Sequence, residues 1–433
     1  MAGLADRALR QADPHPATRD MVEGTVDHRT QTGDEGRPSI ETCPVRNTAP
    51  FAVPPPGRQA ECRRRFARIA LAVLMACGSA PSGAIAGDGK LPRFQVDDQW
   101  MKLPAQWRLG DVSAVDVDRQ GRVYVLHRPR SLVGEDRARA APPVLVFAPD
   151  GTFLSGWGGP GTGYEWPDTE HSLAVDARGH VWIAGNARPP AGAGDDMLLE
   201  FDARHRFVRQ LGRKGASRGD GDTRNLNAPG DLVIDDVRHE VYIADGYGNR
   251  RVVVYDSRTG RFKRMWSAFG AVPPADPAPA FRPKGAPFAP EDGPGPAGFN
   301  GVHGVEVARD GLVYVSDRNN QRVQVFTRAG RYLKQMFVNR NRPSAQTASG
   351  LAVSADRAQR YLYVADWGNS ELLVYDRISL LLLGRIAAPG EAAGQVTTPH
   401  LIAVDRRGRL YVAEVKARRV QRFTPEPTRE GSR

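Results

Sequence analysis

The sequence predicts an all-β protein whose main domain is a six-bladed β-propeller. One frame recurs six times: a short apolar strand, a polar turn, and a second strand rich in Val, Tyr and Ile. Alternating β-branched and aromatic residues indicate strands, and repeats of about 40 residues with several strands each are typical of propeller blades. A histidine opens every second repeat. Together these observations predict a ring of six sheets with a functional site at its axis.

Each repeat begins at one key position, directly before its first strand. The key positions, in chain order, are Ser113, His171, Gly230, His303, Ser349 and His400. In a closed ring of six repeats, residues of alternate repeats lie about 120° apart around the axis. Three imidazoles that face one point, with a fourth position left open, are typical of a catalytic zinc site. We therefore predict that the three histidines bind zinc.

The other strands can be assigned in order within each repeat. Second strands are expected at residues 181–184, 312–316 and 410–413, third strands at 251–255, 322–326, 371–375 and 419–423, and a fourth strand at 332–336. The last repeat stops after its third strand, and residues 94–101 precede the first repeat without a repeat of their own. We expect this N-terminal segment to supply the outer strand of the last blade, which would close the ring and remove an open sheet edge.

Three connections between repeats are long, at residues 158–170, 211–228 and 271–298. The last of them is rich in Pro, Gly and Ala, and is too broken by proline to form a packed element. Each connection leads into an inner strand beside a key position. Long loops on one face of a repeat array are typical of its binding face, so we predict that ligands bind on the histidine face.

The composition divides the chain into four segments. Residues 1–60 are rich in Pro, Arg and Asp and are expected to form a disordered leader, or to precede a true start near Val53 and not be translated. Residues 61–86 combine a charged stretch, an apolar stretch and a small-residue ending, which is the pattern of an export signal. Its apolar run is too short to span a bilayer. The propeller is expected at residues 87–425, followed by a flexible tail at 426–433.

The cysteines bear on location and redox chemistry. All three, Cys43, Cys62 and Cys77, precede the propeller, so we expect neither a disulfide nor thiolate chemistry within it. The export signal predicts a periplasmic or secreted protein. The stretch Leu74-Met-Ala-Cys77 also resembles a lipoprotein box, and a lipid on Cys77 is the one route to the membrane that the sequence offers.

The charge balance argues against a nucleic-acid partner. The formal net charge is +11, and part of it comes from the leader and the export signal. Arginines of the propeller are spread over turns and are not clustered on one strand face, as a nucleic-acid site would require. We expect a monomer with a basic surface that favours anionic ligands.

A second set of positions lies directly after the second strand of each repeat. Its members are Arg128, Asn186, Tyr247, Arg318, Trp367 and Val415. The second strand runs antiparallel to the first, so its end lies near the key position of its own blade. We expect Arg128, Tyr247 and Arg318 to surround the metal and Trp367 to lie at the substrate rim. Two guanidinium groups suit a carboxylate, which they bind with paired donors.

At these residues the chain resembles the peptidyl-α-hydroxyglycine α-amidating lyases, the lyase domain of peptidylglycine α-amidating monooxygenase. That family has a six-bladed propeller of the NHL type, and the resemblance covers residues 103–423. Its zinc is held by three histidines at the starts of blades, in frames that match those of His171, His303 and His400. Its catalytic tyrosine lies in an Asp-Gly-Tyr-x-Asn stretch, matched at residues 245–250 with Tyr247.

The family's two arginines also have counterparts. Arg318 lies in the stretch Asp317-Arg-Asn-Asn, and Arg128 follows a histidine at the end of a second strand. The resemblance implies a zinc-dependent carbon–nitrogen lyase that cleaves N-acyl- or peptidyl-α-hydroxyglycine to an amide and glyoxylate. Tyr247 would be the general base, and Arg128 and Arg318 would bind the terminal carboxylate of a small-molecule or peptide substrate.

The sequence also departs from the family. The family has a structural calcium held by two backbone carbonyls, matched by Val115 and Leu173, and by an aspartate whose position here is Leu401. Calcium therefore stays an open expectation. Two other functions remain open: a non-catalytic NHL propeller that binds a peptide or glycan, and a metal-dependent lactonase-like propeller, although no carboxylate occupies a key position. The remaining propeller histidines, which are His127, His180, His205 and His239, are expected to be solvated.

Overall fold

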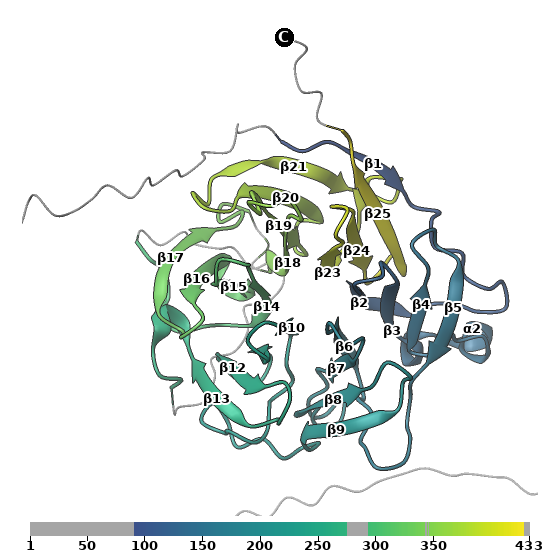
Figure 1. Cartoon of the computed structure of the whole chain (residues 1–433), viewed down its shortest axis with the longest axis horizontal. Helices are drawn as coiled ribbons and strands as arrows, with labels where there is room; N and C mark the ends of the chain where they lie inside the picture. Colours follow the sequence, from purple (N-terminus) through teal and green to yellow (C-terminus); the bar gives the residue numbers. More distant parts are fainter. Residues whose placement is uncertain (1–90, 275–292, 343, 345, 428–433) are drawn as a thin grey trace, which may run out of the picture. The chain divides into compact units, whose positions relative to one another are not determined.

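The computed structural model describes residues 91–274, 293–342, 344 and 346–427. Its strands form six antiparallel sheets arranged in a ring, with the strand that carries the key position, or directly follows it, innermost in each sheet (Figure 1). In the described residues the α-helical structure is one short helix, α2 (Gly134–Ala138), between two strands of the first blade. The prediction of an all-β, six-bladed propeller is therefore confirmed.

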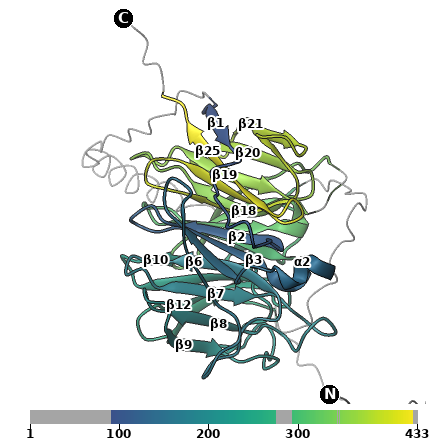
Figure 2. The same cartoon turned by 90° about the vertical axis from the view of Figure 1, so that its right-hand side faces the viewer.

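The first three blades follow one another directly along the chain. Blade one contains β2 (Asp111–Val117), β3 (Val123–Arg128), β4 (Val144–Phe147) and β5 (Phe153–Trp157). Blade two contains β6 (Glu170–Val175), β7 (Val181–Gly185), β8 (Met197–Phe201) and β9 (Phe207–Gly212). Blade three contains β10 (Asp231–Asp235), β11 (Glu240–Asp245), β12 (Arg251–Asp256) and β13 (Phe262–Trp266). Seen from the side, the strands of blade two lie one below another (Figure 2).

The other three blades complete the ring. Blade four contains β14 (Val302–Val307), β15 (Leu312–Asp317), β16 (Arg322–Thr327) and β17 (Tyr332–Phe337). Blade five contains β18 (Ala348–Val353), β19 (Tyr361–Asp366), β20 (Glu371–Asp376), β21 (Leu382–Pro389) and the short parallel strand β22 (Gln395–Val396). Blade six contains β23 (Pro399–Val404), β24 (Leu410–Glu414), β25 (Arg419–Pro425) and, outermost, β1 (Phe94–Asp97).

The strand β1 comes from the opposite end of the chain to the rest of its blade. It pairs antiparallel with β25, from Phe94 opposite Pro425 to Asp97 opposite Arg422. The strand ends before residue 101, the expected limit, and Trp100 is buried between the first and last blades instead. Its ring centroid lies 5.9 Å from that of Phe147 and 5.3 Å from that of Tyr411, so the segment contacts both blades that meet at this seam.

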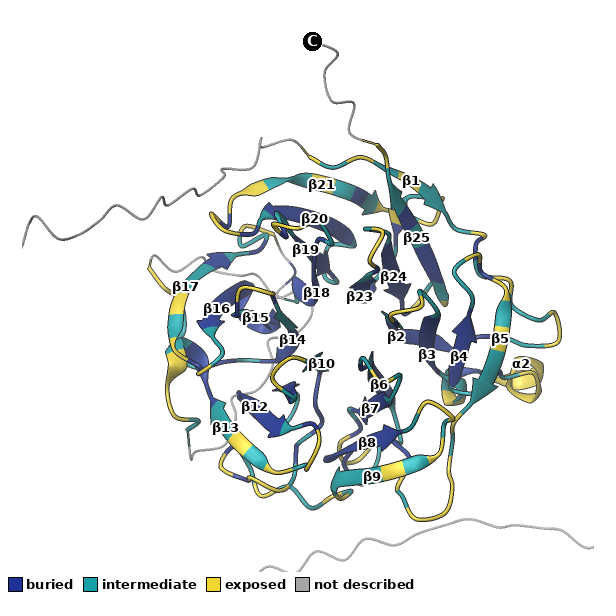
Figure 3. Ribbon diagram, in the orientation of Figure 1, coloured by how far each residue is buried: buried dark blue, intermediate teal, exposed yellow. Residues whose placement is uncertain are grey.

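The apolar core lies between neighbouring blades. One cluster, for example, joins Val252 and Tyr242 of blade three to Val313 and Phe326 of blade four. Inner and middle strands are buried, and exposure is concentrated on the outermost strands and the turns (Figure 3). The inner strands of each blade are buried on both faces of the sheet, which explains why they consist mainly of Val, Leu, Ile and Ala.

Buried ion pairs hold two turns that reach the histidine face. Asp245 ends β11 and lies 2.9 Å from Arg251, which begins β12. Asp317 ends β15 and lies 2.7 Å from Arg322, which begins β16. All four side chains are fully buried. Because an unpaired buried charge is costly, each pair constrains the turn between its strands, and these turns carry Tyr247 and Arg318.

The expectation that His127 is solvated is wrong. His127 lies on β3 and is fully buried. Its Nδ1 accepts a hydrogen bond from the backbone N–H of Gly110 at 3.1 Å, and its Nε2 donates to the carbonyl of Pro142 at 2.9 Å. Two backbone partners satisfy the imidazole, so it can be buried in its neutral form.

The other three of these histidines are half-buried. His180 lies with its Nδ1 2.7 Å from a carboxylate oxygen of Glu200, and His205 stacks on Trp157 with ring centroids 4.4 Å apart. His239 lies in the turn between β10 and β11, with a φ of 54°. The prediction that His180, His205 and His239 are solvated therefore holds only in part, because each is half-buried.

Several predictions fall on residues outside the described ranges. They concern the leader, the export signal, lipidation at Cys77 and the tail beyond residue 427. Among the described helices, none is both long and apolar enough to cross a bilayer.

Candidate functional site

The three predicted histidine ligands meet at the axis of the propeller. His171, His303 and His400 belong to β6, β14 and β23, the innermost strands of alternate blades. All three are buried, and one side-chain nitrogen of each lies within 4.8 Å of the corresponding nitrogens of the other two. The distances between ring centroids are 4.7 to 5.2 Å. Ring closure therefore brings together residues that are up to 229 positions apart, from 171 to 400.

The other three key positions orient the histidines. The Nδ1 atoms of His171, His303 and His400 donate to the carbonyl oxygens of Gly230, Ser349 and Ser113, at 2.6, 3.2 and 2.5 Å respectively. Each acceptor lies in the next blade around the ring. A carbonyl oxygen can only accept, so each Nδ1 carries the hydrogen and each Nε2 presents a lone pair.

Two of the three Nε2 atoms lie against the hydroxyl of Tyr247. The phenolic oxygen lies 3.0 Å from Nε2 of His171 and 3.1 Å from Nε2 of His303. The ring of Trp367 lies 5.6 Å from that of His400. Two members of the second set, Tyr247 and Trp367, therefore lie against histidines of the neighbouring blades.

The electrostatics of the triad suit a metal ion. Burial, together with the neighbouring cations, lowers the pKa of His400 to about 3. Burial and repulsion from neighbouring groups hold the pKa values of His171 and His303 well below the ordinary value. All three imidazoles are thus neutral near pH 7. The three Nε2 atoms then present three lone pairs, while Tyr247 offers a single hydroxyl hydrogen. A bound cation would therefore interact with these lone pairs better than the protein's own groups do.

Two arginines beside Tyr247 lack a carboxylate partner in the described part of the chain. Arg318 is only 6% exposed, its Nη1 donates to the phenolic oxygen at 3.1 Å, and its Nε has no hydrogen-bond partner. Arg128 is half-buried, and its Nε donates to the carbonyl of Glu170, the residue before His171, at 2.7 Å. Burial lowers the pKa of Arg128. Unpaired cations in such a setting favour an anionic ligand.

Sequence reasoning missed a third arginine, Arg188. In blade two, the position directly after the second strand is Asn186. The loop that follows β7 continues past it and brings Arg188 into contact with Tyr247. Its Nη1 donates to the backbone carbonyl of Tyr247, and its guanidinium lies 5.9 Å from the centre of the phenol ring. The arginine lies outside the repeating frame, so periodicity alone could not have identified it. The sixth position of the set, Val415, is buried and apolar.

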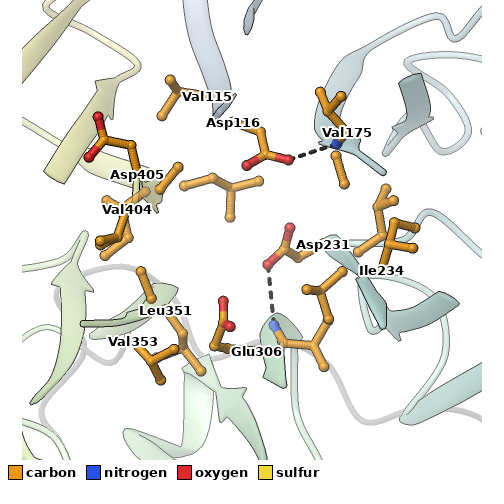
Figure 4. Close-up of a pocket in the computed structure, with 18 of the residues that line it drawn as sticks. Val115, Asp116, Val175, Asp231, Ile234, Glu306, Leu351, Val353, Val404 and Asp405 are labelled. Atoms are coloured by element: carbon orange, nitrogen blue, oxygen red, sulfur yellow. Dashed lines mark hydrogen bonds between the residues drawn. The ribbon is translucent and has the colours of Figure 1, made fainter. Parts of the chain in front are cut away.

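The residues expected at a calcium site lie elsewhere on the axis. Val115, Leu173 and Leu401 line a cavity of about 300 Å³ between the inner strands. The carboxylates of Asp116, Asp231 and Glu306 project into the same cavity (Figure 4). Asp116 accepts a hydrogen bond from the N–H of Val175 at 2.7 Å, and Asp231 accepts one from that of Val305 at 3.2 Å. Calcium binding at Val115 and Leu173 remains a prediction.

Comparison with known proteins shows a local match to the NHL repeat and similarity to two groups of proteins. The NHL repeat family matches residues 299–326, a segment that contains His303 and Arg318. The chain is 29% identical to NHL repeat-containing protein 3 of Mus musculus over 350 residues, which are 77% of this chain and 85% of that protein.

Amidating enzymes are more distant relatives. The chain is 23% identical over 353 residues to peptidyl-glycine alpha-amidating monooxygenase A of Xenopus laevis, covering 77% of this chain and 33% of that protein. It is 25% identical over 347 residues to peptidyl-alpha-hydroxyglycine alpha-amidating lyase 1 of Drosophila melanogaster, covering 73% of this chain and 57% of that protein.

Proposed function

We propose that this protein is a zinc-dependent carbon–nitrogen lyase that converts an N-acyl- or peptidyl-α-hydroxyglycine to an amide and glyoxylate. One observation carries the proposal: three neutral histidines meet at the axis, two of them in contact with the hydroxyl of Tyr247, beside two arginines that form no ion pair in the described residues. A metal ligand set, a base and a carboxylate site are thus adjacent. The similarity to amidating enzymes supports the same reading.

His171, His303 and His400 would hold the zinc ion through their Nε2 atoms. Zinc with three protein ligands keeps an open position, and when bound it supplies Lewis acidity toward a substrate oxygen. The backbone acceptors of the three Nδ1 atoms keep each ring in the tautomer that such binding requires.

The remaining residues account for binding and proton transfer. Arg318 and Arg128 bind the carboxylate of the hydroxyglycine, which supplies the negative charge they lack. Tyr247, in its phenolate form, accepts the proton of the substrate hydroxyl. The electrons of that O–H bond form the aldehyde of glyoxylate, the carbon–nitrogen bond breaks, and its electron pair takes up a proton on nitrogen to complete the amide. The overall reaction conserves atoms and electrons without a further reactant.

The direct test is product analysis with purified, zinc-loaded protein. A panel of N-acyl-α-hydroxyglycines should yield equal amounts of glyoxylate and amide, and a chelator should abolish turnover. Absence of glyoxylate from a protein shown to contain zinc would contradict the lyase proposal. We further propose that the protein acts outside the cytoplasm as a monomer, consistent with the expected export signal.

A second candidate function is a non-catalytic NHL propeller that binds a peptide or glycan. The similarity to NHL repeat-containing protein 3 favours it, since that relative matches over more of its own length and at higher identity than the amidating enzymes. A scaffold does not require neutral histidines converging on a tyrosine. If ligand binding persists without turnover and without metal, the scaffold is the better description.

A further inference from the structure

The turns between first and second strands lie at the end of the propeller opposite to the histidines. Each first strand runs away from its key position, as β6 does from His171 to Val175, before the chain turns into the second strand. Contacts join these turns to one another, since Arg119 lies 3.5 Å from Asp236. We call this end the distal face. Its inner turns are residues 118–122, 176–180, 236–239, 308–311, 354–360 and 405–409.

Each of these six turns carries an exposed arginine. The six are Arg119, Arg178, Arg238, Arg309, Arg357 and Arg406. They are scattered through the sequence, but the closed ring places one of them in each blade around the axis. Arg309 and Arg406 also line the axial cavity. The distal face thus presents a ring of guanidinium groups, which attracts anionic partners.

Several acidic residues of this face are buried or paired. Asp118, Asp176 and Asp405 open three of the turns and are at most 6% exposed. Each carboxylate accepts two hydrogen bonds of 2.8 or 2.9 Å from backbone N–H groups of its own turn. The exposed Asp310 lies 2.7 Å from Arg377. The carboxylates therefore serve the turns, and the arginines dominate the charge that solvent meets.

One turn of blade five adds apolar side chains to the distal face. It joins β20 to β21, and β20 runs in the same direction as the first strand of its blade. Ile378, Leu381 and Leu382 are 47%, 67% and 53% exposed. The corresponding turn of blade three has the same backbone hydrogen bonds, but carries Arg258 and Arg261 in place of Ile378 and Leu381. The fold therefore does not require apolar residues here.

The N-terminal end of the propeller meets the same region. Leu91 is 36% exposed and packs on β21, where a carbon added to Gly384 would lie 3.2 Å from its Cδ2 atom. The expected export signal precedes Leu91, and Cys77 is 14 positions away, from 77 to 91. An extended chain of that length reaches about 50 Å. A protein held at a membrane through Cys77 would therefore keep the distal face close to the lipid surface.

We propose that the distal face docks on an anionic lipid bilayer. The ring of arginines contacts headgroup phosphates, while Ile378, Leu381 and Leu382 enter the interface between headgroups and acyl chains. Exposed leucines beside the arginines favour this partner over a nucleic acid, whose phosphates would leave them against charge. Docking in this way turns the histidine face toward solvent, where a soluble substrate can reach it. The inference is independent of the proposed lyase reaction.

Vesicle flotation tests the docking with the full chain. Every variant carries Cys77→Ser, which prevents lipidation, and all share the residues before Leu91. Vesicles of mixed phosphatidylglycerol and phosphatidylcholine should bind the protein more tightly than pure phosphatidylcholine vesicles, and high salt should weaken the binding. The triple variant Arg238→Gln, Arg357→Gln and Arg406→Gln should bind up to about 100-fold more weakly, at about fivefold for each basic residue.

A matched control removes three exposed arginines from the histidine side. Arg137 follows β3, and Arg213 and Arg224 follow β9, two strands that end on that side. Their exchange for Gln changes the net charge equally and should leave binding nearly unchanged. Equal loss in the two triple variants, or equal binding of neutral and anionic vesicles, would overturn the inference. Binding of duplex DNA without binding of vesicles would overturn it as well.

A fluorescent label shows which side meets the lipid. With Cys43→Ser and Cys62→Ser also in place, an environment-sensitive dye on Leu381→Cys should brighten and shift to the blue on anionic vesicles. The same dye on Val133→Cys, an 80% exposed position on the histidine side, should not respond. Equal responses at the two positions would indicate attachment through another part of the chain and contradict docking by the distal face.

Discussion

The Nδ1 atom of His400 lies 2.5 Å from the carbonyl oxygen of Ser113, although the two residues are 287 positions apart. The first residue belongs to the last blade and the second to the first blade. This hydrogen bond spans the seam at which the ring closes, so the orientation of one candidate ligand depends on closure. The same relationship, a histidine bonded to the key residue of the next blade, recurs at His171 and His303. The site is thus a property of the whole ring.

Metal content tests the ligand assignment. His303→Ala should lose most of the zinc while the fold survives, because the blades are held by their sheets and cores. His205→Ala, which alters a half-buried histidine stacked on Trp157, should keep the metal. Elemental analysis and circular dichroism would check both variants. Full zinc retention by His303→Ala would remove the basis for the metal site.

Tyr247→Phe tests the general base. The variant removes one hydroxyl and keeps the ring, so packing should change little. We expect kcat to fall by about 10²–10⁴-fold, the usual contribution of a general base, with a smaller effect on substrate affinity. Steady-state kinetics with glyoxylate detection would measure both, and zinc content would serve as the control. Near-normal turnover would show that the tyrosine has a packing role only.

The arginines allow a matched comparison of stability and binding. Arg318→Met removes a buried cation that has no carboxylate partner in the described residues, so the free energy of unfolding should not fall. Arg322→Met removes the partner of buried Asp317 and should cost about 3–5 kcal/mol. Urea titration would compare the two.

Substrate binding should be weakened more by Arg318→Met than by Arg322→Met, the opposite of their order of effect on stability. Arg318→Met and Arg128→Ala should both weaken substrate affinity and slow turnover, because the carboxylate charge exists in the ground state and in the transition state. Arg322→Met should affect both less at temperatures where it stays folded. If Arg318→Met destabilised the protein as much as Arg322→Met, Arg318 would be a structural residue.

The axial cavity predicts a pH dependence of stability. Burial raises the pKa of Asp116 to about 7 and those of Asp231 and Glu306 to about 8. The unfolded chain releases these protons near pH 4, so the folded state binds more protons between about pH 4 and pH 8. The free energy of unfolding should therefore fall as the pH rises through this window, by up to about 1.4 kcal/mol per pH unit for each group.

Glu306→Gln should make this pH dependence shallower. Urea titrations at several pH values from 5 to 9 would compare the variant with the wild-type protein, and Glu135→Gln, on the exposed helix α2, would serve as the control. A variant that kept the wild-type slope would show that Glu306 gives up its proton in the folded state as readily as in the unfolded chain.

Local pattern was sufficient for the architecture and for most of the candidate site. The alternation of apolar residues identified strands, their recurrence identified six blades, and the position of each histidine within its repeat predicted which residues meet at the axis. Tyr247, Arg318 and Arg128 followed from counting to the ends of the second strands. These inferences hold because antiparallel pairing and repetition convert sequence spacing directly into spatial position.

Other features depended on the tertiary structure. The burial of His127, the approach of Arg188 to Tyr247 and the gathering of Asp116, Asp231 and Glu306 in one cavity involve atoms from different blades or from loops outside the repeat. The sequence by itself determined the ring and the residues that face its axis. The tertiary structure decided which loop side chains reach the site and which charged groups lie beside one another, because loop paths and inter-blade distances are set by packing between segments far apart in the chain. No local period in the sequence records them.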